Sequence, residues 1–272
     1  MQNREGQHLD ERAARSQLAE VAREIYARKL SGAMDGNLSI RLGKDRFVTT
    51  PSGVHKGRLT PADMLLVDGA GRVIGTPGKA PDGKWLKPSS ELGLHLVSYA
   101  RRPDVGAVIH AHPPLAIAYT LAGGKLSEPL VSEVIFAVGQ IATAPYTTPT
   151  TAQVPEVLGD YVACYDCIIM PRHGSVTVGA TLDLALARLD ALEHTANIAC
   201  MVKMLGGAPP IQAGEVDRLF DLARPVPPPY RCETNACPPP EPTAARRLDP
   251  PAAGELEARL VQEVLRALSQ RP

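Results

Sequence analysis

A proline-rich segment near the C-terminus constrains the fold of this 272-residue chain more than any other feature. Ten of the 26 prolines lie between Pro225 and Pro251. Proline lacks the backbone N–H that helices and sheets need, so such a run favours extended, polyproline-like conformations and does not form a packed core. We therefore predict a folded domain over residues 1–222, a linker over 223–253 and a C-terminal segment over 254–272.

The C-terminal segment contains GELEARLVQEVLRALSQ, with apolar residues four apart at Leu256, Leu260, Val264 and Leu268. Glu and Arg fill much of the rest, which predicts one short amphipathic helix. A long linker followed by such a helix resembles the encapsulation peptides that load enzymes into bacterial microcompartments. The resemblance implies a shell protein as partner and the compartment lumen as location. The alternative is a helix that packs on its own oligomer.

The charge balance argues against partners that are bound through net charge. Lys+Arg and Asp+Glu both count 29, so neither nucleic acid nor an anionic membrane is an expected partner. No run approaches the roughly 20 apolar residues that span a bilayer, and the N-terminal segment lacks the apolar core of a secretory signal. Five cysteines are an odd number and a poor disulfide framework, so we expect a reducing, cytoplasmic location. Cys232 and Cys237 could be oxidised or free, and we assign the cysteines no role.

Hydrophobic periodicity and turn residues predict a mixture of helices and strands over about residues 10–222. The expected helices cover residues 11–30, 88–102 and 181–205. The expected strands cover residues 38–42, 46–50, 64–68, 72–75 and 107–112, with two more in 167–180 that join at His173.

Histidines at strand ends predict a metal site. His110 and His112 are two apart on one expected strand, so both imidazoles point to the same side and can reach one ion. His173 ends another strand, and Glu91 lies near the start of a helix, where a carboxylate gains from the helix dipole. Three imidazoles and a carboxylate predict a Zn²⁺ site with an exchangeable position. His95 follows Glu91 by four residues and could orient that carboxylate.

Small polar loops form a second group, which predicts an anion site. Backbone N–H groups, hydroxyls and a helix N-terminus together suit a phosphate monoester. Each loop has an alternative explanation as a turn or a helix cap. Ser89 and Ser90 directly precede Glu91, which favours an anion bound beside the metal. The loops are Gly36–Asn37, Ser52–Gly53 and Ser89–Ser90.

Five motifs in this order and spacing resemble the class II aldolase/adducin family, closest to the L-fuculose-phosphate aldolase type. They are GNLSIR, TPSGVHKGRLTPADMLLVD, KPSSELGLH, RPDVGAVIHAHPP and RHGSVTVG, and the resemblance covers about residues 12–207. It implies an α/β fold with a central, mainly antiparallel sheet flanked by helices on both sides. It also implies a homotetramer with active sites at subunit interfaces.

The resemblance also assigns roles to residues. The family's zinc histidines match His110, His112 and His173, with one Zn²⁺ or another divalent metal per subunit. Its acid/base glutamate, which is also a metal ligand, matches Glu91. Its phosphate-binding positions match Asn37, Ser52, Gly53, Ser89 and Ser90.

The implied reaction is the reversible cleavage of a ketose 1-phosphate, of the L-fuculose or L-rhamnulose type. The products are dihydroxyacetone phosphate and an aldehyde, lactaldehyde. The metal would polarise the ketone, Glu91 would move the proton of the dihydroxyacetone fragment, and the polar loops would hold the phosphate.

One position departs from the aldolase pattern. Enzymes of this type carry a tyrosine on the segment that matches LVSEVIFAVGQ, and here Glu133 stands in its place. Tyr119, Tyr146, Tyr230 or Glu133 itself could take over proton transfer on the aldehyde side. The alternatives are therefore a decarboxylase acting on a sugar or aromatic acid, a dehydratase, an epimerase, and a non-catalytic adducin-like binding module. Epimerases of the family usually carry Asp at position 91, and adducin-like modules lack the three histidines.

Overall fold

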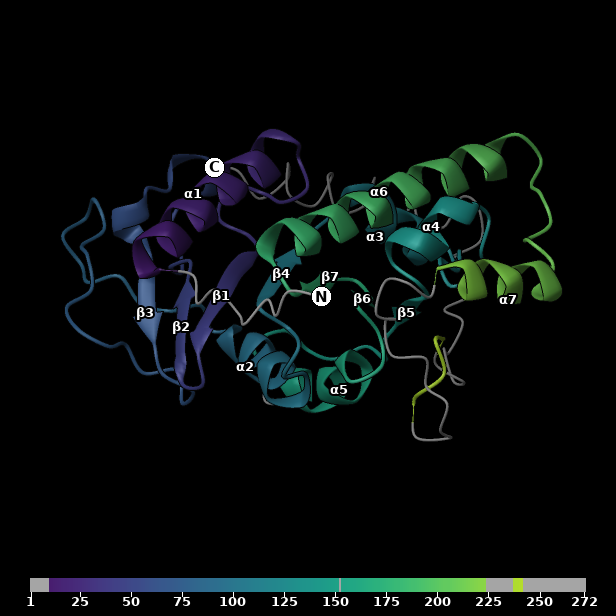
Figure 1. Cartoon of the computed structure of the whole chain (residues 1–272). Coiled ribbons are helices and arrows are strands. Elements are labelled where there is room, and N and C mark those ends of the chain that lie inside the picture. Colours follow the sequence, from purple (N-terminus) through teal and green to yellow (C-terminus); the bar gives the residue numbers. More distant parts are fainter. Residues whose placement is uncertain (1–9, 152, 224–236, 242–272) are drawn as a thin grey trace, which may run out of the picture.

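The computed structural model describes residues 10–151, 153–223 and 237–241. Its core is a seven-stranded sheet in the order β3-β2-β1-β4-β7-β6-β5 (Figure 1). Neighbouring strands are antiparallel, except for the parallel pair β5 and β6. The predicted α/β fold with a mainly antiparallel sheet is therefore confirmed. The strands are β1 (Asn37–Gly43), β2 (Arg46–Thr49), β3 (Leu65–Val67), β4 (Ala107–Ala111), β5 (Ile141–Thr143), β6 (Cys167–Met170) and β7 (Gly174–Gly179).

Helices cover both faces of the sheet (Figure 1). One face packs against α1 (Glu11–Ala27) and α6 (Leu182–Met204), and the opposite face packs against α2 (Leu92–Arg101) and α5 (Gln153–Val162). Three further helices pack around the C-terminal part of α6 in a third apolar cluster. They are α3 (Pro114–Leu121), α4 (Ser132–Ala137) and α7 (Ala213–Leu222). Short 3₁₀ turns cover Lys56–Arg58 and Pro61–Asp63.

The side chains of β1 alternate between the two faces of the sheet. Leu38 and Ile40 enter the apolar cluster that α1 and α6 cover. Asn37 and Ser39 point the other way and pair across the sheet with His110 and Val108 of β4. The face toward α2 thus carries a group of buried polar side chains.

Several element boundaries differ from those predicted. The first helix ends at Ala27 because Lys29 adopts a φ of 60°, which a helix does not allow. Residues 72–75 form only a bridge, Val67 to Val73. The proline break after β4 starts α3, since Pro114 occupies the first helical turn, where its missing N–H costs nothing. The helices α4, α5 and α7 and the strand β5 were not predicted.

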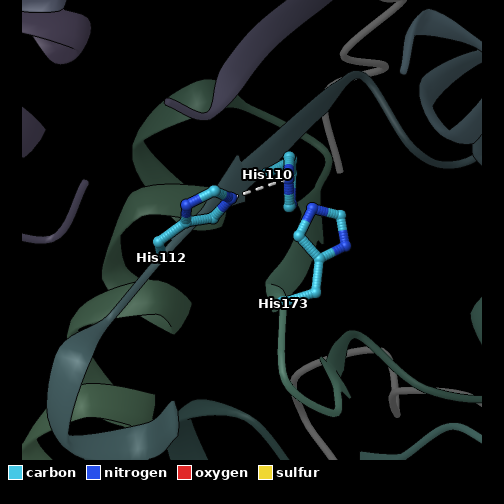
Figure 2. Close-up of side chains that lie close together, drawn as sticks. All are labelled: His110, His112 and His173. Atoms are coloured by element: carbon cyan, nitrogen blue, oxygen red, sulfur yellow. Dashed lines mark hydrogen bonds between the residues drawn. The ribbon is translucent and has the colours of Figure 1, made fainter. Parts of the chain in front are cut away.

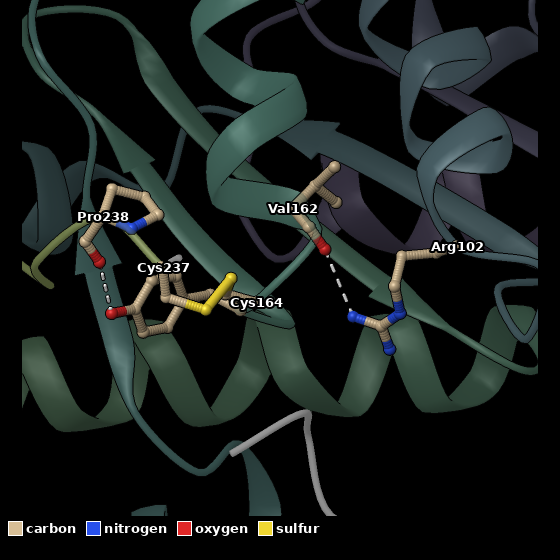
Figure 3. Close-up of a disulfide and its surroundings, with 6 residues drawn as sticks. Arg102, Val162, Cys164, Cys237 and Pro238 are labelled. Carbon is tan, nitrogen blue, oxygen red and sulfur yellow. Dashed lines mark hydrogen bonds between the residues drawn. A yellow bond between two sulfur atoms is a disulfide. The ribbon is translucent and has the colours of Figure 1, made fainter. Parts of the chain in front are cut away.

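Residues 237–241 pack against the body, in contrast to the extended linker predicted for 223–253. A disulfide joins Cys164 to Cys237, so the cysteines were wrongly given no role (Figure 3). The Thr143 N–H donates to the Pro240 carbonyl over 2.7 Å, and the Tyr165 hydroxyl donates to the Pro238 carbonyl over 2.8 Å. β5 is an edge strand, and proline carbonyls can accept its free N–H groups although proline cannot donate.

The rest of the predicted linker, residues 224–236 and 242–253, lies outside the described residues. So does the helix predicted within 254–272. Among the described helices, none combines the length and the apolar character that a membrane crossing needs.

Candidate metal centre and anion site

Three histidines from two segments of the chain meet at one end of the central strands. His110 lies in β4, His112 follows that strand, and His173 lies in the turn between β6 and β7. Their imidazoles gather around a common space (Figure 2), and one nitrogen of each lies within 4.8 Å of the others. The Nε2 atoms of His110 and His112 are 3.1 Å apart. Clustered imidazole nitrogens are ligands that zinc and other divalent transition metals prefer.

The surroundings keep these imidazoles ready to bind a metal. His110 is buried, and its Nδ1 lies 2.9 Å from the Ser175 carbonyl of β7. The carbonyl only accepts, so Nδ1 carries the hydrogen and the Nε2 lone pair faces the cluster. Burial, together with the nearby His110 and His173, lowers the pKa of His112 to about 3. His112 is therefore neutral at pH 7, the state in which imidazole ligates metals.

Glu91 completes a set of four donors. Its Oε2 lies 3.3 Å from His110 Nε2, and its Oε1 lies 3.1 Å from His173 Nε2. Burial raises the pKa of Glu91, but the nearby imidazoles of His110 and His173 outweigh burial and hold it well below its usual range. Glu91 Oε1 is buried yet has no well-aligned hydrogen bond among the described residues. An orphaned carboxylate oxygen beside three imidazole nitrogens fits a divalent metal.

Two glycines allow the histidine segments to approach each other. The sequence placed Gly36 in a predicted anion-binding loop and gave Gly174 no role in the site, so this packing role of both was not predicted. A Cβ at Gly174 would lie 2.5 Å from the Ala111 carbonyl and 2.6 Å from the His112 ring. Gly36 has a φ of +72°, and a Cβ there would lie 2.7 Å from the His110 carbonyl. The signal in the sequence was a glycine directly beside a candidate ligand or anion-binding residue, His173 or Asn37.

The three polar loops meet beside Glu91. An isolated bridge joins Pro51 to Pro88, and the Ser52 N–H donates to the Lys87 carbonyl over 2.9 Å. This contact brings Ser52–Gly53 next to Ser89–Ser90. Gly53 has a φ of +68° with open space where a Cβ would be, and Ser90 is exposed.

Asn37 links this group to Glu91. Its amide nitrogen lies 3.2 Å from Ser89 Oγ and 3.3 Å from Glu91 Oε2. Ser89 Oγ accepts the Glu91 N–H over 3.1 Å at the start of α2. The residues expected to bind phosphate thus lie together at a helix N-terminus, directly beside the carboxylate.

Among the described residues, none of the candidates expected on the aldehyde side contacts Glu91 or the three histidines within one chain. Glu133 is exposed on the first turn of α4, and in the described part of the chain it makes no ion pair with the cluster histidines. Tyr119 packs in the α3–α6 region, Tyr146 is exposed in the loop after β5, and Tyr230 lies outside the described residues.

His95 also differs from its expected role. Its ring contacts Asn37 and Ser39 rather than Glu91. The helix α2 begins only at Leu92, so the helical spacing of four residues does not extend back to Glu91.

The sequence of this chain is similar to those of several known proteins. The family model described as the Class II Aldolase and Adducin N-terminal domain matches residues 16–200. The chain is 28% identical to a 3-oxo-tetronate 4-phosphate decarboxylase of Escherichia coli over 218 residues, covering 77% of this chain and 96% of that protein. It is 34% identical to a methylthioribulose-1-phosphate dehydratase of Methylococcus capsulatus over 192 residues, covering 66% and 89%. It is 32% identical to an L-fuculose phosphate aldolase of Methanococcus vannielii over 176 residues, covering 64% and 88%.

Proposed function

The chain belongs to the class II aldolase and adducin family, and from this we propose that it is a metal-dependent aldolase acting on a ketose 1-phosphate. The substrate is of the L-fuculose or L-rhamnulose 1-phosphate type, and the products are dihydroxyacetone phosphate and lactaldehyde. One observation carries the proposal: Glu91 lies between metal-binding nitrogens and the polar loops. Its carboxylate is 3.1 Å from His173 Nε2 and 3.3 Å from the Asn37 amide nitrogen.

The three histidines and Glu91 would hold the metal. Zinc suits three imidazoles and one carboxylate, and other divalent ions also fit this donor set. When bound, the ion would polarise the substrate carbonyl and stabilise the negative charge that develops on its oxygen.

The polar loops would bind the phosphate. The Asn37 amide and the Ser89 hydroxyl lie 3.2 Å apart at the N-terminus of α2, where backbone N–H groups attract anions. Ser90 adds a hydroxyl from the same loop as Ser89, and Ser52 and Gly53 add hydroxyl and backbone donors from the neighbouring loop. Anchoring the phosphate aligns the carbon–carbon bond with Glu91, so binding energy distant from the bond contributes to its cleavage.

Glu91 would move the proton. When the carbon–carbon bond breaks, its electron pair stays with the dihydroxyacetone fragment as an enediolate. Glu91, which would take up a proton from solvent before this step, donates that proton to the carbon and returns to the carboxylate form. In the synthesis direction, the Glu91 carboxylate removes the same proton.

A second group must accept the hydroxyl proton on the aldehyde side. Since Glu133 is exposed on α4 and does not contact Glu91, we propose that this group comes from another subunit of a homotetramer. Glu133 or Tyr146 of that subunit would then complete the site.

A second candidate is a decarboxylase of a phosphorylated 3-oxo sugar acid. Glu133 in place of the expected tyrosine favours it, because loss of CO₂ leaves the same enediolate but needs no proton acceptor on an aldehyde side. The decarboxylase relative, of which the match covers 96%, also supports it.

Product analysis distinguishes the two candidates. Zinc-loaded protein is incubated with L-fuculose 1-phosphate, L-rhamnulose 1-phosphate or 3-oxo-tetronate 4-phosphate, with and without a chelator. The aldolase proposal predicts chelator-sensitive release of dihydroxyacetone phosphate from a ketose 1-phosphate. If CO₂ is released from 3-oxo-tetronate 4-phosphate and neither ketose 1-phosphate is cleaved, the decarboxylase proposal replaces the aldolase proposal.

A further inference from the structure

A chain of buried polar groups connects the interior of α2 to the catalytic carboxylate. The Tyr99 hydroxyl lies 2.7 Å from Ser39 Oγ, which lies 2.7 Å from His95 Nδ1. His95 Nε2 is hydrogen-bonded to Asn37 Oδ1, and the Asn37 amide nitrogen lies 3.3 Å from Glu91 Oε2. Ser39 and His95 have no exposed surface, and Asn37 and Tyr99 are almost fully buried. Every member therefore has to find its hydrogen bonds within the protein.

The direction of each hydrogen bond follows from its neighbour. The Glu91 carboxylate accepts hydrogen bonds, so Asn37 presents its NH₂ group to it. The Asn37 carbonyl then faces His95 and can only accept, which places the hydrogen of His95 on Nε2. A neutral imidazole has one N–H, so His95 Nδ1 accepts from Ser39, and Ser39 Oγ in turn accepts from Tyr99.

The opposite set of hydrogen-bond directions would place two acceptors against each other at the Glu91 carboxylate. With its hydrogen on Nδ1, His95 would accept from the Asn37 amide, and the Asn37 carbonyl would face the Glu91 carboxylate at about the observed 3.3 Å. Two acceptors at that distance repel each other. The Ser39 hydroxyl would also have to accept from His95 instead of donating to it.

The surroundings of His95 favour the neutral state of its imidazole. Complete burial and the nearby His110 lower the pKa of His95 to about 3, although Glu91 raises it. The ring thus carries one hydrogen at neutral pH.

We propose that His95 is a positioning residue: its Nε2–H locks the Asn37 amide so that the NH₂ group faces Glu91 and Ser89, where it serves as a donor to an anionic substrate group. One N–H of Asn37 points to Glu91, and the other, 3.2 Å from Ser89 Oγ, is the one that a phosphate oxygen would share. Among the described residues, the hydrogen bonds of the His95 ring go to Asn37 and Ser39, and His95 acts through these two residues. That the anion is the substrate phosphate rests on the proposed function, whereas the orientation of the amide does not.

The first test reads the hydrogen position directly. Long-range ¹H–¹⁵N NMR spectra of the zinc-loaded protein distinguish the two tautomers of each histidine, and the His95 signals are those absent from the His95→Gln spectrum. The expected result is a neutral ring with its hydrogen on Nε2. A hydrogen on Nδ1, or a doubly protonated ring, overturns the proposal.

The second test compares two variants with inorganic phosphate as the probe. His95→Leu removes both hydrogen bonds, so we expect phosphate affinity and kcat/KM to fall about 10- to 100-fold while zinc stays stoichiometric. His95→Gln can still donate to Asn37 and accept from Ser39, so it should recover most of both losses. If His95→Leu folds and binds phosphate like the wild type, the positioning role is wrong.

Ser98→Ala is the matched control. Ser98 is also fully buried on α2, but in the described part of the chain its hydroxyl donates to the Leu94 carbonyl of its own helix, over 2.7 Å, and to no other group. The phosphate affinity of the Ser98→Ala variant and the tautomer of its His95 should match those of the wild type. If no sugar phosphate is turned over but the tautomer and phosphate results come out as expected, the proposed function fails and the positioning role stands.

Discussion

Glu91 Oε1 and His173 Nε2 lie 3.1 Å apart, so the start of α2 and the turn between β6 and β7 share one site. Glu91 precedes the central strand β4 in the chain and His173 follows it, and His110 of β4 lies 3.3 Å from the same carboxylate. Any change that moves this turn away from β4 should therefore disturb metal binding and catalysis together.

Replacing His110 and His112 together by Ala should abolish metal binding, because two of three clustered imidazoles are lost. Elemental analysis of the purified variant measures metal content, and circular dichroism checks that it is folded. His194→Ala is the control, since His194 is exposed on α6 outside the cluster. Stoichiometric metal in the double variant would rule out the assigned site.

Gly174→Ala should weaken metal binding about tenfold or more, because the new Cβ would lie 2.5 Å from the Ala111 carbonyl and push the His173 turn off β4. Titration of the metal-free protein with zinc measures the change. Gly214→Ala is the control: it lies in α7 with open space around its Cβ, so it should leave zinc affinity unchanged and stabilise the protein by about 0.5–1 kcal/mol. Equal zinc affinities for both variants would refute the packing argument.

Much of the site could be predicted because its signals are local. The period of two along a strand placed His110 and His112 on one side, and the turn at His173 followed from Gly174 after an apolar run. The role of His95 was misjudged because spacing cannot tell that α2 begins one residue after Glu91. The disulfide from Cys164 to Cys237 spans 73 residues, and no local pattern encodes such a long-range contact.

Lys56 should make stability depend on pH. Its side chain is buried and its ammonium donates to the Met34 and Val54 carbonyls at 3.3 Å each. Burial lowers the pKa of Lys56 to about 8, although Asp35 raises it. An unfolded lysine keeps its proton to about pH 10.4, so the unfolded state binds more protons above pH 8 and stability rises with pH there.

The size of this effect follows from the shift in pKa. Each unit corresponds to about 1.4 kcal/mol, so wild type should gain up to about 3 kcal/mol relative to Lys56→Met between pH 8 and pH 10. Urea unfolding of both proteins at pH 7, 9 and 10 measures the difference. A stability difference that stays constant over this range would show that Lys56 is not held in a buried, partly deprotonated state.

A chain ending at Glu241 should keep full catalytic activity. Glu241 accepts a hydrogen bond from Ser127 over 2.9 Å, so this end point retains the docked segment and its disulfide to Cys164. The removed residues 242–272 are proposed to bind a microcompartment shell protein. Co-expression of both forms, fused to a fluorescent protein, with shell proteins should give puncta only for the full chain. Diffuse fluorescence from both forms, with dissociation of the truncated one into monomers, would instead assign the tail to the oligomer.

Glu91→Gln tests the central claim, that a carboxylate beside the metal ligands moves the proton. The amide keeps the size of the side chain but cannot take up a proton, so release of dihydroxyacetone phosphate from the best ketose 1-phosphate should fall roughly 10²- to 10⁴-fold. Glu156→Gln, an exposed glutamate on α5, should show no change. The measurement is kcat with the zinc content and phosphate affinity of each variant determined alongside. A loss of this size with phosphate binding retained is the predicted result, and near-normal turnover by Glu91→Gln would contradict the account.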